Sequence, residues 1–110
     1  MPSRRPRLAS PGASASYVSH DPIADATPFI ATLKDRDGMA IPGAWISVRL
    51  EGGGLLRPEG AYDAQAFTFQ RTDESGVAQF TWLPGKGSVP GAVTLTASAA
   101  TSGALVLRRL

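Results

Sequence analysis

The sequence predicts an all-β fold, a sandwich of about seven short strands, and three observations support that prediction. The chain has 110 residues, which suits one domain with one modest hydrophobic core. It contains 12 Gly and 9 Pro, and neither residue is well tolerated inside long helices. Apolar and polar residues alternate in short runs, separated by turn signals at intervals of about ten residues. Short strands joined by turns explain this pattern better than helices do.

The first part of the chain predicts an extended arm. Proline recurs at positions 2, 6, 11 and 22 among Ser, Ala and Arg. Such a stretch has too little apolar surface to offset the loss of chain entropy on folding. Its one plausible strand is Tyr17–Ser19. We therefore expect an arm over residues 1–22 and a sandwich over residues 23–110.

The body predicts six strands in order along the chain. Alternation of apolar and polar residues places them at 28–34, 44–51, 66–72, 77–83, 92–99 and 105–107. The turns between them are marked by Asp35–Gly38, Ile41–Gly43, Gly52–Gly54, Asp73–Gly76 and Pro84–Gly87. One face of each strand is expected to be buried, which places Phe67, Phe69 and Trp82 in the core. A slip of one residue would move Phe67 and Phe69 into water, so the register should be well specified.

The segment from Leu55 to Ala64 predicts an irregular loop, because it contains Pro58 and Gly60 and shows no alternation. Long loops on sandwiches often carry function. This loop either presents Leu55, Leu56 and Tyr62 as a contact tip or folds them back as a lid on the core.

Three runs of the body follow one another in a recognisable order. The first joins the Asp35–Gly38 turn to the Ile41–Ala44 corner and then to the alternating strand that contains Ile46. The second is Thr72–Ala78 and the third is Gly91–Ser98. Together they resemble the bacterial Ig-like domains of the invasin and intimin type. The resemblance implies an immunoglobulin-like β-sandwich.

A second resemblance is to the prealbumin-like domains of collagen-adhesin stalks and carboxypeptidase tails. It is carried by Thr72–Gly76 followed by Phe80–Gly85. It implies the same sandwich and the same non-catalytic role.

No catalytic, cofactor or metal site is expected, and the chain is not predicted to be an enzyme. His20 is the only histidine and lies in the arm, away from a rigid scaffold that could place a nucleophile beside it. There is no cysteine. The acidic pairs Asp35 with Asp37 and Asp73 with Glu74 lie in tight turns, where Asx side chains bond nearby backbone N–H groups. The spacing of a calcium loop fails after the first of these turns.

Trp45 is the candidate contact residue of the body. Alternation places it opposite Ile46 and Val48, on the face that should be solvated. Exposed tryptophan is favoured at contact hot spots. The alternative is that another strand, the arm or a loop covers the indole.

The arm supplies the other candidate contact residues, Arg4, Arg5, Arg7 and Tyr17. The three arginines give the first twenty residues a charge of +3, because no acid precedes Asp21. They either remain solvated or dock on an acidic neighbour. Three charges give limited, salt-sensitive affinity for phosphates, so nucleic acid is not expected as a partner. No run approaches the ~20 apolar residues of a membrane helix, so no membrane is expected either.

The bacterial Ig-like family, to which the first resemblance points, includes adhesin repeats, stalk domains and appended domains of tailed-phage virion proteins. We expect a single copy without an export signal or a membrane anchor, which departs from the adhesin pattern. We therefore expect a virion decoration or accessory protein, made in the cytoplasm and anchored by its arm to capsid or tail subunits, with self-association left open. The alternative is an adhesion or carbohydrate-binding module at the cell surface.

Overall fold

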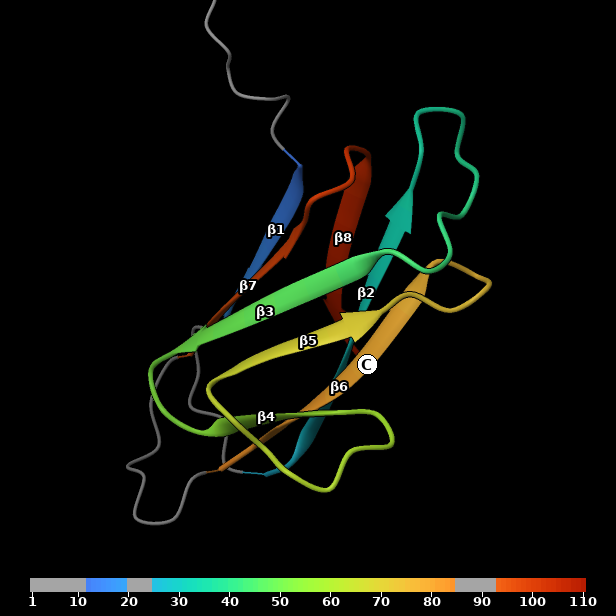
Figure 1. Cartoon of the computed structure of the whole chain (residues 1–110). Coiled ribbons are helices and arrows are strands. Elements are labelled where there is room, and N and C mark those ends of the chain that lie inside the picture. The colour runs from blue at the N-terminus through green and yellow to red at the C-terminus, as the bar shows by residue number, and fades with distance from the viewer. Residues whose placement is uncertain (1–11, 20–24, 85–92) are drawn as a thin grey trace, which may run out of the picture.

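The computed structural model describes residues 12–19, 25–84 and 93–110, and these residues form strands and turns without a helix (Figure 1). Four strands, β1, β7, β3 and β5 in that order, form an antiparallel sheet A. Four more, β4, β6, β2 and β8, form an antiparallel sheet B. The bounds are β1 Ala13–Val18, β2 Thr27–Lys34, β3 Trp45–Glu51, β4 Leu55–Pro58, β5 Phe67–Arg71, β6 Val77–Leu83, β7 Thr94–Ala99 and β8 Ala104–Arg109. The prediction of an all-β fold is confirmed, with eight strands rather than seven.

The connectivity alternates between the two sheets. Odd-numbered strands lie in sheet A and even-numbered strands in sheet B, so consecutive strands of the described chain do not pair. In the constant-type immunoglobulin order, by contrast, strands A and B, D and E, and F and G are neighbours within a sheet. The strand order therefore differs from the one that the Ig-like resemblance implies.

The core lies between the two sheets and is built from the inward positions of the strands. Phe29 and Phe80 stack at a centroid distance of 5.7 Å. Trp82 is buried, as predicted, and its Nε1 donates to the Gly53 carbonyl at 3.1 Å. Each large apolar side chain stabilises the fold by roughly 1.5–3 kcal/mol on burial. The largest fully buried side chains are Phe29, Leu33, Ile46, Leu56, Leu95, Val48 and Val93.

The prediction that Phe67 and Phe69 lie in the core is wrong. Directly opposite residues of an antiparallel pair point to the same face of a sheet. The ladder pairs Val48 with Thr68 and Ile46 with Gln70. Because β3 buries Ile46 and Val48, β5 must turn Thr68 and Gln70 inward, and Phe67 and Phe69 point to solvent.

The structure places part of the predicted arm in sheet A. Residues 13–18 form β1, which pairs with β7 from Ala13 opposite Ala99 to Val18 opposite Thr94. The ladder bonds one side of this segment to β7, and Tyr17 packs edge-on against Phe29 at 5.0 Å between ring centroids. Residues 1–11 and 20–22 of the predicted arm lie outside the described residues.

Two turns repeat one local design. The Asp35 carboxylate accepts from the N–H groups of Asp37 and Met39, both at 2.9 Å. The Asp73 carboxylate accepts from Ser75 and Val77 at 2.8 and 3.0 Å. The glycine that ends each turn has a positive φ, 83° in the first and 75° in the second. The predicted turn chemistry of the two aspartates is confirmed.

The segment predicted as an irregular loop begins with a strand instead. Leu55–Pro58 is β4, which pairs with the C-terminal part of β6, and Leu56 is completely buried. Gly54 precedes it with φ 89°, and a Cβ there would overlap the Trp82 indole. Trp82 therefore requires glycine at this position.

Candidate interaction surface

The outer face of sheet A carries a cluster of exposed aromatic side chains at its β5 edge. Alternation turns Trp45 outward on β3 and Phe67 and Phe69 outward on β5, with exposed fractions of 58%, 42% and 58%. Arg71 shares their parity and is also exposed. We call Trp45, Phe67, Phe69 and Arg71 the aromatic face.

The members of the aromatic face hold one another in place. Phe67 and Phe69 meet edge-on at 5.0 Å between ring centroids, and Trp45 meets Phe69 edge-on at 6.4 Å. The guanidinium carbon of Arg71 lies 5.6 Å from the centroid of the Trp45 ring. Such a cation–π contact stabilises by about 0.5–1 kcal/mol at an exposed site. The cluster is therefore partly ordered before any partner arrives.

A buried threonine fixes the corner from which the aromatic face projects. The Thr72 hydroxyl donates to the Ile41 carbonyl at 2.6 Å and accepts from the Ala44 N–H at 2.9 Å. Two backbone bonds also join this corner to Thr72, from Gly43 N–H to the Thr72 carbonyl and from Thr72 N–H to the Ala44 carbonyl. Trp45 follows Ala44 directly and Arg71 precedes Thr72, so the corner sets the positions of both side chains.

A hollow of about 300 Å³ adjoins the aromatic face on the open side of β5. Phe67 and Phe69 form one wall, and Pro58 from β4 contributes further apolar surface above the buried Leu56. Asp63 lines its polar side. The hollow extends the contact surface from the sheet face toward the edge of the sandwich.

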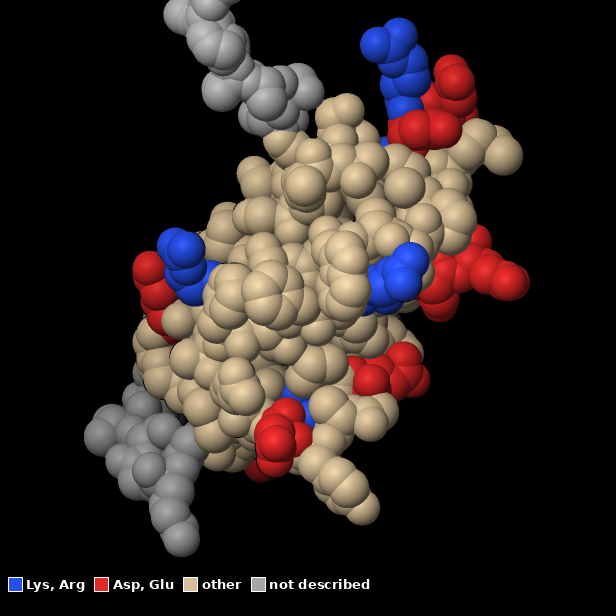
Figure 2. Space-filling model, viewed as in Figure 1, with Lys and Arg blue, Asp and Glu red and all other residues tan. Residues whose placement is uncertain are grey.

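Charged side chains flank the three rings of the aromatic face. Figure 2 shows a central uncharged surface with both basic and acidic side chains at either side of it. The ladder between β3 and β5 places Arg71 opposite Trp45 and Arg49 opposite Phe67. A cation therefore lies beside an aromatic ring in both of these cross-strand pairs. Aromatic residues and arginine are the types enriched at the buried centres of protein interfaces.

The predicted contact residues do not come together as one site. Trp45 is exposed, as its predicted position implied, and Tyr62 is 99% exposed in the β4–β5 connection. Leu55 is partly exposed, but Leu56 is fully buried and cannot present a contact surface. Tyr17 is half-buried against the core. Arg4, Arg5 and Arg7 lie outside the described residues.

Phe67 and Phe69 were missed as surface residues. The alternating pattern of β5 showed two faces, and the larger apolar residues were assigned to the core. One signal argued otherwise: Arg71 shares the parity of both phenylalanines, and a charged residue is seldom buried.

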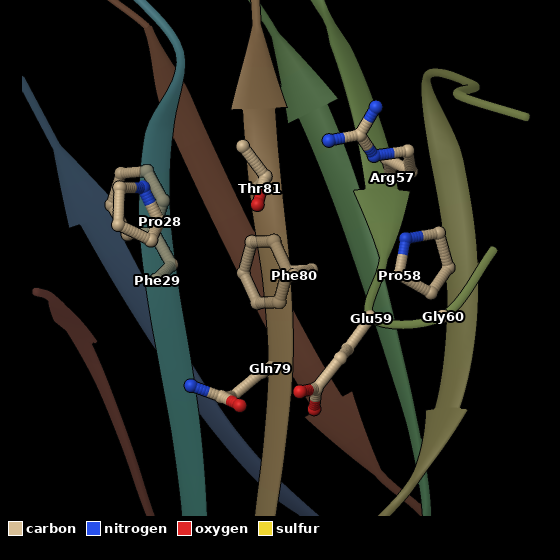
Figure 3. Close-up of a pocket in the computed structure, with 9 residues that line it drawn as sticks. All are labelled: Pro28, Phe29, Arg57, Pro58, Glu59, Gly60, Gln79, Phe80 and Thr81. Carbon is tan, nitrogen blue, oxygen red and sulfur yellow. The ribbon is translucent and has the colours of Figure 1, made fainter. Parts of the chain in front are cut away.

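A second hollow, of about 250 Å³, lies on the outer face of sheet B. In Figure 3 the Gln79 amide and the Glu59 carboxylate point toward one another. With the Gln79 nitrogen turned to the carboxylate, the N–O distances are 2.9 and 3.1 Å. Arg57 is the other charged side chain in its lining.

Within the described ranges, His, Cys, Asp and Glu do not gather into a group that could hold a metal ion. His20 lies outside the described residues. The described part of the chain also contains no helix long and apolar enough to span a membrane. No protein-family model, curated protein or solved structure matches this chain. The surface geometry is therefore the basis for assigning a role.

Proposed function

We propose that this chain is a non-catalytic structural and interaction module that binds a protein partner through the aromatic face. The observation that carries this proposal is the exposure of Trp45, Phe67 and Phe69 as one cluster with Arg71. Isolated exposed apolar residues are common, but a contiguous exposed aromatic patch usually marks a site of interaction. Trp and Arg are also the residue types most often found as hot spots.

The more specific form of the proposal is a decoration or accessory protein of a virion, from a tailed phage or a phage-like particle. The body would bind capsid or tail subunits through the aromatic face, and the basic segment containing Arg4, Arg5 and Arg7 would add an anchor. Support comes from the sandwich architecture and from the two Asp-x-x-Gly turns, which resemble those of Ig-like domains. The alternating strand order counts against the Ig-like relationship, so the virion assignment depends on the contact surface.

Carbohydrate binding by an adhesion module is the alternative, and the exposed Trp45 indole is the observation that favours it. Sugar recognition by stacking needs an open aromatic face. Here the Arg71 guanidinium occupies one face of the indole, and Phe69 stands at 86° to it. This geometry presents ring edges and a cation rather than a flat platform, which favours a protein partner.

A binding assay with matched variants tests the proposal. The purified chain is immobilised and exposed to the capsid and tail proteins encoded by neighbouring genes, and in parallel to a glycan array. Loss of a hot spot costs at least ~2 kcal/mol, so Trp45→Ala should weaken binding to the protein partner about 30-fold or more. Val18→Ala is the control, because Val18 is also exposed on sheet A but lies at the opposite edge.

Each outcome bears on the proposal. Binding to a structural protein that falls with Trp45→Ala and not with Val18→Ala supports it. Glycan binding that falls with Trp45→Ala supports the carbohydrate alternative instead. Binding of no structural protein, or binding that survives Trp45→Ala, contradicts the proposed role of the aromatic face.

A further inference from the structure

β5 is an edge strand whose free backbone groups can be assigned from the ladder on its other side. Among the described strands, β5 pairs only with β3 in sheet A. The Leu50 N–H donates to the Ala66 carbonyl, and the Thr72 N–H donates to the Ala44 carbonyl. Even-numbered residues of this segment thus direct their backbone groups toward β3. Because the direction alternates along a strand, the N–H and C=O groups of residues 67, 69 and 71 point to the open edge.

The β5 edge is only partly protected: it is five residues long and ends in exposed Arg71, but it contains no proline and its ladder with β3 shows no bulge. Natural edges are blunted by charge, proline, bulges or short length. β4 is short and ends in Pro58, and β8 ends in Arg108 and Arg109. β5 instead presents exposed Phe67 and Phe69 beside a hollow of about 300 Å³. This edge has both the free hydrogen-bonding groups and the apolar surface for another strand.

We infer that two copies of this chain pair through β5, antiparallel, about a two-fold axis at Phe69. In this register each residue with free edge groups faces another such residue. Phe69 faces Phe69 of the second copy, and Phe67 faces Arg71 of the second copy. The two A sheets then form one continuous sheet.

The side chains on the outer face are complementary to themselves in this register. One row across the joined sheet reads Trp45, Arg71, Phe67 of the second copy and Arg49 of the second copy, because the β3–β5 ladder already fixes the first and last pairs. Aromatic and cationic groups therefore alternate. The Arg71 guanidinium has a ring on both sides, and the Arg49 guanidinium has the Phe67 ring on one side. Like charges do not face one another across the new ladder. An isologous interface requires this kind of self-complementarity.

The inward positions of β5 also match. Thr68 falls opposite Gln70 of the second copy. The Gln70 Oε1 is a buried acceptor without a hydrogen-bond partner among the described residues. A threonine hydroxyl at the facing position brings a donor to this edge. A second copy of the chain therefore fits the edge better than an unrelated strand, which would supply neither the alternating row nor this donor.

The inferred dimer goes beyond the proposed function, because it uses the edge of sheet A while the outer face stays open. It would place two aromatic faces side by side on one sheet. Trp45 lies one strand away from the new ladder, so a variant there should affect the partner and leave dimerisation intact. The two ideas can thus fail separately.

The test is a charge-swap pair at Phe69, measured by sedimentation equilibrium on the full chain. Wild type should show a concentration-dependent monomer–dimer equilibrium. Phe69→Lys and Phe69→Asp should each be monomeric, because two like charges would meet at the axis. An equimolar mixture should recover the dimer, since Lys then faces Asp. Val106→Lys is the control, because Val106 is 50% exposed on the edge strand of sheet B; this variant should dimerise as wild type does.

Amide exchange gives an independent reading of the register. On raising the protein concentration, the amides of residues 67, 69 and 71 should gain protection. The amides of Thr68 and Gln70, already bonded to β3, should not change. A circular dichroism spectrum matching wild type shows that each Phe69 variant is folded. A wild type that stays monomeric, a Phe69→Lys variant that still dimerises, or an equimolar mixture that does not recover the dimer would overturn the inference.

Discussion

Replacing Thr72 by Val should destabilise the fold strongly, although the two side chains have nearly the same shape. The hydroxyl serves two backbone groups of the corner, the Ile41 carbonyl at 2.6 Å and the Ala44 N–H at 2.9 Å, and Thr72 is only 4% exposed. Each buried group left without a partner costs about 1–3 kcal/mol. The extra methyl returns at most about 0.8 kcal/mol. We expect a net loss of about 2–4 kcal/mol.

The assay is urea unfolding followed by tryptophan fluorescence, to which the buried Trp82 and the exposed Trp45 both contribute, with the midpoint and slope fitted together. For a domain of this size a loss of 2–4 kcal/mol lowers the melting temperature by about 10–20 °C. Thr96→Val is the matched control, because Thr96 lies half-buried on the outer face of sheet A. It should change stability by less than about 0.5 kcal/mol. If the two variants differ by less than about 1 kcal/mol, the reasoning about unpaired backbone groups is refuted.

Two further predictions concern other parts of the sandwich. Gly54→Ala should lower the free energy of unfolding by at least about 2 kcal/mol more than Gly53→Ala does. Both glycines have positive φ, but only a Cβ at position 54 overlaps the Trp82 indole. Equal midpoints in urea would show that the indole moves aside freely. Tyr17→Ala should lower the free energy of unfolding by about 2 kcal/mol through loss of the contact with Phe29, whereas an unchanged midpoint would mean that β1 behaves as a detachable arm.

Local features of the fold were predictable because their causes lie within a few residues. Asp35 and Asp73 bond backbone N–H groups two and four residues ahead, and the glycines at 38 and 76 supply the positive φ. The strands from β2 onward, apart from β4, follow the alternating pattern closely. The burial of Trp82 also followed from its parity with Ala78 and Phe80.

Of the candidate surface, the sequence indicated Trp45 and not its neighbours. The position of Trp45 followed from the strong apolar face formed by Ile46, Val48 and Leu50. β5 gave no such contrast, because Phe and Thr or Gln alternate on it and either face can be solvated. Its partners in the aromatic face therefore became visible only with the ladder between β3 and β5.

The sequence by itself determined the class of secondary structure and the places where the chain turns, because alternation and Asx-Gly chemistry act over neighbouring residues. Only the tertiary structure decided that residues 13–18 join sheet A, that the strands alternate between sheets, and which face of β5 meets solvent. Alternation divides a strand into two faces without saying which is inner. That choice is made by the residues opposite, which come from a distant part of the chain and are brought there by the fold.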